Sequence, residues 1–135
     1  MKSVIIYSTQ NAIGVLVEAM ISGCDANFET FQADSTRELL SMARVLRPRL
    51  IILLDIVPLL DGCDIVARLH EIESSGRGRL SRSRATIYVI TWQQSEHTVL
   101  SLLESGIDQY LTFPICIERL RHKVSQQMTS NTLRQ

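Results

Sequence analysis

The sequence predicts an α/β domain with a five-stranded parallel sheet covered by helices on both faces. Short segments rich in β-branched and apolar residues alternate five times with longer segments in which apolar residues recur every three or four positions. This alternation favours a parallel sheet. The run Leu50 to Leu54 is apolar at every position, as expected for a central parallel strand that is buried on both faces.

The first half of the chain supplies three of the expected strands, at residues 4–7, 27–31 and 50–54. Asn11 is a suitable N-cap residue for a helix from about residue 12 to 22, and Gly23 ends it. Asp34 or Ser35 caps a second helix, and Pro48 ends it.

The second half supplies the remaining two strands, expected at residues 87–90 and 107–112. Helices are expected from Ile65 to about Glu73, from the cap Ser95 to Gly106, and along Ile117 to Val124. The polar stretch 74–84 is predicted to be an exposed loop. It carries four arginines, which are either solvated or in contact with an anion, a partner protein or DNA phosphates: Arg77, Arg79, Arg82 and Arg84.

Right-handed crossovers between parallel strands leave few arrangements, of which the flavodoxin-like strand order 2-1-3-4-5 is the best known. In such sheets the functional site lies at the carboxyl ends of the strands. The residues expected at that edge are Ser8, Thr9, Leu54, Asp55, Thr91, Trp92 and Phe113.

Length and composition limit the possible function. The 135 residues are expected to form one domain over 1–128, followed by a polar tail at 129–135. The formal net charge is zero, which gives no electrostatic argument for nucleic-acid or membrane binding by the chain as a whole. No apolar run approaches the roughly 20 residues of a membrane span, and no signal peptide is recognisable, so a cytoplasmic location is expected. The three cysteines and three histidines form no ligand-like cluster, and neither a metal nor another cofactor is expected.

Two segments resemble the receiver domain of bacterial response regulators. The first, Pro48 to Gly62, is an apolar run that ends in Asp, followed by Pro and then by Asp-Gly. The second, Thr91 to Pro114, contains Gly-Ile-Asp-Gln-Tyr in place of the family's Gly-Ala-Asp-Asp-Tyr turn. The likeness covers about residues 3–125, and the two segments together are fairly specific.

The resemblance implies a site for phosphoryl transfer in which several residues have been replaced. The family holds Mg²⁺ with two acidic residues after its first strand, and these positions fall on Ser8 and Thr9. The family's lysine after the fifth strand falls on Phe113, which offers no cation for phosphoryl oxygens. The threonine after the fourth strand is kept as Thr91, and the family's switch aromatic is kept as Tyr110.

The acceptor aspartate has two possible registers. Counting forward from Pro48 and backward from Asp61 places Leu54 at the acceptor position, with Asp55 one residue late. Because side chains alternate faces along a strand, such a slip points the carboxylate elsewhere. A one-residue shift of the following loop would return Asp55 to the site. In either register the metal pair and the lysine are missing, so phosphoryl transfer is not expected.

We therefore interpret the chain as an atypical receiver, a pseudo-receiver that regulates by dimerisation or partner binding without phosphorylation. No catalytic set is recognisable, so it is not expected to be an enzyme. A transcription regulator with a DNA-binding domain after the polar tail is the favoured context. The alternatives are a stand-alone adaptor that docks on a kinase or another regulator, and a sensor with a small ligand beneath Ser8, Thr9 and Thr91.

The expected partner is a second copy of the chain. In many response regulators the face formed by the fourth helix, the fifth strand and the fifth helix builds a two-fold dimer with crossed ion pairs, and this chain carries charges there. Ordinary surface charge is the alternative interpretation. Under two-fold symmetry Asp108 of one subunit would meet a base of the other. The interface residues expected are Glu104, Asp108, Arg119 and Lys123.

Overall fold

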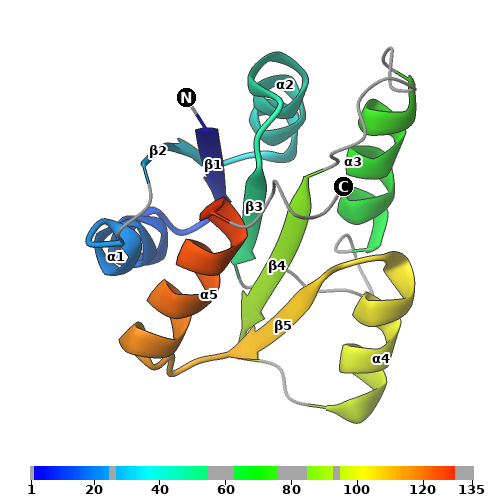
Figure 1. Cartoon of the computed structure of the whole chain (residues 1–135). Helices are drawn as coiled ribbons and strands as arrows, with labels where there is room; N and C mark the ends of the chain where they lie inside the picture. The colour runs from blue at the N-terminus through cyan, green and yellow to red at the C-terminus, as the bar shows by residue number, and fades with distance from the viewer. Residues whose placement is uncertain (1, 25–26, 55–62, 76–84, 93–94, 130–135) are drawn as a thin grey trace.

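The computed structural model describes residues 2–24, 27–54, 63–75, 85–92 and 95–129 (Figure 1). Five strands and five helices alternate along the chain in the order β1 (Lys2–Tyr7), α1 (Asn11–Ile21), β2 (Phe28–Ala33), α2 (Thr36–Leu46), β3 (Leu50–Leu54), α3 (Cys63–Ser75), β4 (Thr86–Thr91), α4 (Glu96–Ser105), β5 (Gln109–Thr112) and α5 (Ile117–Thr129). The strands form one parallel sheet in the order β2-β1-β3-β4-β5, which confirms the predicted α/β fold and topology.

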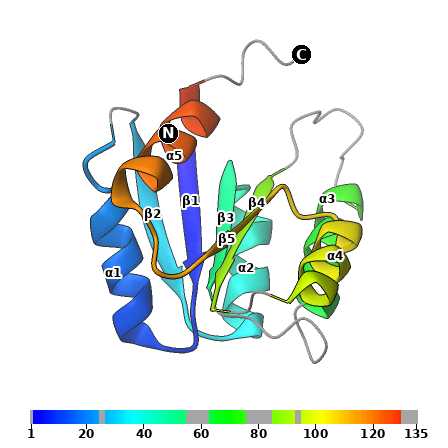
Figure 2. The same cartoon turned by 90° about the horizontal axis from the view of Figure 1, so that it is seen from below.

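Helices cover both faces of the sheet. Apolar residues of α1 and α5 pack on one face in a cluster that includes Val17, Leu54 and Leu120. Residues of α2, α3 and α4 pack on the other face in a second cluster that includes Leu39 and Leu102. Figure 2 shows α1 at one end of the sheet and the neighbouring helices α3 and α4 at the other. All five residues of β3 are buried, as the apolar run predicted.

Local capping explains where several helices begin and end. The Ser35 hydroxyl accepts a hydrogen bond from the backbone N–H of Glu38 at 3.1 Å, so Ser35 rather than Asp34 caps α2. The Glu38 carboxylate in turn accepts from the Asp34 N–H at 3.0 Å. Gly106 follows α4 with φ of 105°, a left-handed conformation that glycine adopts without steric cost. Because the chain turns after Gly106, β5 begins at Gln109 and is two residues shorter than the predicted strand at 107–112.

Several other boundaries differ from the prediction by a few residues, including those of α1 and α3. Helix α1 begins at Asn11 itself, and its N-cap residue is Gln10, whose side chain makes no capping hydrogen bond. Helix α3 continues to Ser75, so the first two residues of the stretch predicted as a loop, 74–84, are helical instead. The four arginines of that stretch lie outside the described residues. Among the helices that the structure describes, none is long and apolar enough to span a membrane.

Candidate functional site

The register of the sheet brings the ends of four strands to one edge. Tyr7 of β1 lies opposite Leu53 of β3, and Leu54 lies opposite Ile90 of β4. Thr91 then pairs with Thr112 at the end of β5. The residues that end or follow these strands are therefore neighbours at the carboxyl edge: Ser8, Leu54, Thr91 and Phe113.

Ser8 is buried and its hydroxyl is used within the chain. The Oγ donates to the Gln10 carbonyl at 2.8 Å and accepts from the Gln10 backbone N–H at 3.0 Å. The Ser8 N–H donates to the Ala33 carbonyl at 3.0 Å, which ties the end of β1 to β2. The hydroxyl thus closes the turn that leads into α1. A carboxylate at this position could not donate to the Gln10 carbonyl, so the serine suits the turn in a way that an acid would not.

The residues at the family's metal position do not fit Mg²⁺. This ion prefers anionic oxygen ligands, and Ser8 and Thr9 supply two neutral hydroxyls. Ser8 has already committed its donor and an acceptor lone pair to Gln10. Thr9 is exposed to solvent. The anionic charge of a magnesium site is therefore absent at these two positions.

Leu54 occupies the end of β3 as part of the core. Its side chain is 2% exposed and belongs to the buried cluster on the α1 and α5 face, together with Ile90 and Phe113. Full burial of a leucine side chain stabilises a fold by roughly 1.5–3 kcal/mol. Asp55 lies outside the described residues, as do Pro58, Asp61 and Gly62, so the register of the acceptor stays a prediction.

Phe113, the residue expected at the position of the family's lysine, is also buried, at 7% exposure. Its ring packs against Trp92, with ring centroids 4.6 Å apart and an angle of 32° between the ring planes. The Phe113 N–H donates to the Thr91 carbonyl at 3.1 Å, and the Phe113–Pro114 peptide bond is cis. Trp92 is 57% exposed, so an aromatic pair lies between the apolar cluster and solvent at this edge.

Thr91 and Tyr110, the two residues that match the family's pattern, differ in exposure. Thr91 is completely buried at the end of β4. Tyr110 is half-buried and packs against the α2, α3 and α4 cluster, and burial raises the pKa of its hydroxyl. Ile87 and Val89 of β4 also pack in that cluster, and because side chains alternate along a strand, Thr91 points to the same face. Thr91 and Tyr110 therefore lie on the face of the sheet opposite Leu54 and Phe113.

The four residues expected at a dimer interface are on α4, on α5 and in the turn before β5. Glu104 and Arg119 are exposed. The Asp108 carboxylate accepts from the Ile87 N–H at 2.9 Å, and the Lys123 ammonium donates to the Gln109 side-chain oxygen at 3.1 Å. Asp108 and Lys123 therefore help to hold β5 in place within the chain, a role that the sequence pattern did not reveal.

Tyr88 is a buried polar residue that the sequence did not single out, because it stands inside an apolar strand segment. Its hydroxyl donates to the Lys123 carbonyl at 3.1 Å and so links β4 to α5. Burial and the nearby Asp108 carboxylate together raise the pKa of Tyr88 to about 12, from an ordinary value of 10.0. Because Lys123 is 35 residues away in the sequence, no local pattern predicts this contact.

The Asp108→Asn variant is expected to lower the pKa of Tyr88 while leaving it above 10, because burial remains the larger cause. Wild-type stability should fall between about pH 10 and about pH 12, since the unfolded tyrosine ionises first. Ultraviolet titration of tyrosinate, with Tyr88→Phe as the reference, measures this pKa. An unchanged tyrosine titration in Asp108→Asn would contradict the assigned cause.

No family model and no curated protein sequence matches the chain. Many solved structures do match it. The receiver domain of the response regulator Ssk1 from Saccharomyces cerevisiae, solved with the phosphotransfer protein Ypd1, is 19% identical with a TM-score of 0.79, over 98% of this chain and 92% of that one. A two-component response regulator from Clostridium difficile is 18% identical with a TM-score of 0.75, over 98% and 99% of the two chains.

A third similar structure holds the metal that the fold family uses. It is the receiver domain of the sensor histidine kinase PA1611 from Pseudomonas aeruginosa, with a magnesium ion in its active-site cleft. Identity is 17% and the TM-score is 0.71, over 94% of this chain and 96% of that one. At this level of identity the likeness establishes the fold. The chain therefore has the receiver-domain fold of two-component response regulators.

Proposed function

We propose that this chain is a pseudo-receiver, a regulatory domain that works without phosphorylation. The observation that carries the proposal is the burial of two apolar side chains, Leu54 and Phe113, which the sequence comparison assigns to the family's acceptor and lysine positions. Leu54 and Phe113 belong to one apolar cluster at the carboxyl edge of the sheet. Phosphoryl transfer needs cations beside the phosphoryl oxygens, and an apolar cluster supplies none.

A single conformation is the expected consequence for signalling. In an ordinary receiver, clustered carboxylates repel one another until metal or phosphate alters the balance of charge. Here the positions of the two acids after the first strand are assigned to Ser8 and Thr9, which carry no charge, so this repulsion is absent. Burial of Leu54 and Phe113 stabilises the edge without a metal. The domain is then a constant binding surface, and its regulation comes from partners.

Magnesium is expected to leave the fluorescence of Trp92 unchanged at millimolar concentrations. Trp92 is the only tryptophan, and it packs on Phe113 beside the family's metal position, so binding there would alter its emission. Titration of the wild-type protein with MgCl₂ tests this, with NaCl at matched ionic strength as the control. A saturable change that appears only with Mg²⁺ would contradict the proposal.

We further propose that the domain forms a homodimer through α4, β5 and α5. Glu104 of α4 and Arg119 of α5 are both exposed, which leaves them accessible to a second copy. Asp108 and Lys123 already hydrogen-bond within the chain, so they support the interface mainly by positioning β5. Leu100 and Leu103 of α4 are 51% and 45% exposed and would supply apolar area to the same interface.

The Arg119→Glu variant is expected to weaken dimerisation about three- to tenfold, because it places like charges opposite Glu104 of the second copy. The double variant Glu104→Arg with Arg119→Glu should restore association, since the pair is reversed rather than removed. Sedimentation equilibrium over a range of concentrations measures both. A wild-type protein that stays monomeric at high concentration would rule out the interface.

The adaptor function is a second candidate, and the outer surface of α1 favours it. Val15 and Leu16 are 53% and 52% exposed, and Ala12 and Ala19 extend the same stripe by one turn each. The one acidic residue of this helix, Glu18, is turned to β2, where it accepts from Thr30 and Gln32. An uncharged apolar stripe suits a helix of a phosphotransfer protein. The Leu16→Glu variant distinguishes adaptor binding from dimerisation. It places a charge in the apolar stripe of α1 and leaves the proposed dimer face on α4, β5 and α5 intact.

The proposed context is a larger regulator of transcription, in which the polar tail at 129–135 leads to a DNA-binding domain. The zero net charge of the chain supports the view that any DNA contact is made elsewhere in the protein. The dimer would then set the spacing of two such domains on their site.

A further inference from the structure

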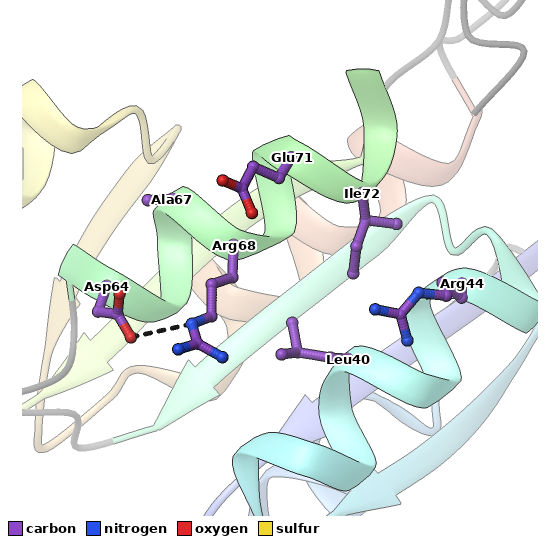
Figure 3. A pocket seen from close by; sticks show the side chains of 7 residues that line it. All are labelled: Leu40, Arg44, Asp64, Ala67, Arg68, Glu71 and Ile72. Carbon is purple, nitrogen blue, oxygen red and sulfur yellow. Dashed lines mark ion pairs between the residues drawn. The ribbon is translucent and has the colours of Figure 1, made fainter. Parts of the chain in front are cut away.

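A groove runs between α2 and α3, on the side of the molecule away from α1 and α5. Its volume is about 340 Å³, within the range of specific binding sites. Figure 3 shows that side chains from both helices point toward the space between them. The residues that line it are Leu40, Arg44, Asp64, Ala67, Arg68, Glu71 and Ile72.

The middle of the groove is apolar. Leu40 of α2 and Ile72 of α3 are half-buried and pack against the core cluster beneath, so each keeps part of its side chain open to the groove. Ala67 is exposed and adds a small side chain to the α3 wall. A partner side chain that covers Leu40 and Ile72 would remove apolar surface from water at about 25 cal/mol per Å².

The charges on the two walls are unequal. On the α3 wall, the Asp64 carboxylate forms an ion pair with Arg68 at 3.1 Å. On the α2 wall, Arg44 is exposed, and its guanidinium has no ion pair or hydrogen bond with the residues that the structure describes. Arg37 of α2 is also exposed, but it does not line the groove. The α2 wall therefore has surplus positive charge beside an apolar centre.

We propose that this groove binds a short segment of a partner protein in which a carboxylate stands next to an aliphatic or aromatic side chain. The apolar side chain covers Leu40 and Ile72, and the carboxylate accepts from the Arg44 guanidinium, as charge complementarity requires. A phosphate backbone fits poorly, because Asp64 and Glu71 stand on the opposite wall.

The size of the groove favours a short segment over a second copy of this domain. A stable interface buries about 800 Å² on each partner, with roughly 20–30 residues a side. Seven residues line this groove, which is well below that number. The site is also separate from the α4, β5 and α5 face, so it is compatible with the proposed dimer and does not depend on it.

Two synthetic peptides test the proposal directly. One repeats the unit Leu-Glu-Glu, and its matched counterpart repeats Leu-Gln-Gln. In a heteronuclear NMR titration of the full ¹⁵N-labelled chain, the acidic peptide is expected to shift amide signals of α2 and α3, including those of Leu40, Arg44 and Ala67. The neutral peptide is expected to bind about threefold to tenfold more weakly, the range for a partly exposed charged hydrogen bond.

Three variants complete the test. Arg44→Gln is expected to raise the Kd of the acidic peptide to that of the neutral one, while Arg37→Gln, which removes the same charge outside the groove lining, should change it less than twofold. Ala67→Glu fills and acidifies the exposed α3 wall without disturbing the core and should abolish binding. Shifts elsewhere on the domain, equal Kd values for both peptides, or full binding by Arg44→Gln would each overturn the proposal.

Discussion

The Leu54→Asp variant is expected to lose about 3–5 kcal/mol of unfolding free energy near pH 7, although it introduces the residue type that the family has at the position to which the ungapped count assigns Leu54. Leu54 is 2% exposed within an apolar cluster. The new carboxylate would have no metal beside it, since Ser8 and Thr9 supply no acidic pair, and no lysine, since Phe113 takes that position. An unpaired buried charge is among the most destabilising changes a core can receive.

The pH dependence of the stability loss identifies the buried carboxylate as its cause. Burial raises the pKa of the introduced carboxyl above its unfolded value of about 3.9, because the neutral form is favoured in the core. The variant should therefore lose stability as pH rises from about 4 through the folded pKa. Urea unfolding at several pH values measures this. Leu54→Asn, which is polar but cannot ionise, is the control and should show the smaller loss without the added pH dependence. A Leu54→Asp protein as stable as wild type at neutral pH would contradict the apolar site.

Phe113→Ala is expected to cost about 3–4 kcal/mol, the usual range for truncating a buried phenylalanine. The Phe113 ring is 7% exposed, belongs to the α1 and α5 cluster and packs on Trp92. Trp92→Ala should cost much less, because the indole is 57% exposed. Thermal or urea unfolding of the two single variants compares them.

A double-mutant cycle isolates the aromatic contact. Phe113 and Trp92 are expected to couple by about 0.5–1.5 kcal/mol, the range for tilted aromatic pairs. The remainder of the Phe113→Ala effect would then belong to the apolar cluster. A loss below about 1 kcal/mol for Phe113→Ala would show that the ring does not contribute to the core at this position.

The fold was predictable from the sequence because its strongest signals are local. The apolar run at 50–54 needs helices on both faces, and the strand pairings place it at the centre of the sheet with all five side chains buried. The cap Ser35 and the glycine at 106 also act through neighbouring backbone groups, so each was readable from a few residues. The predicted strand order also placed Ser8, Leu54 and Phe113 at the same carboxyl edge of the sheet.

The remaining features depend on contacts between distant segments. The bond from Tyr88 to the Lys123 carbonyl joins residues far apart in sequence, and the Asp108 carboxylate is held by the Ile87 N–H. The α2 and α3 groove exists only because two helices lie side by side. Arg47 ends α2 in a left-handed conformation with φ of 47°, although an arginine gives no local signal for it. The position of Asp55 stays a prediction from counting.

Incubation with a small phosphodonor and Mg²⁺, followed by intact mass measurement, tests the central claim most directly. A pseudo-receiver is expected to keep an unchanged mass. Ser8 and Thr9 stand in place of the two acids that would hold the metal, and Phe113 stands in place of the lysine. An ordinary receiver domain treated in parallel confirms that the donor is active. A phosphoryl group that is added to this chain, and that is lost in Asp55→Asn, would contradict the account.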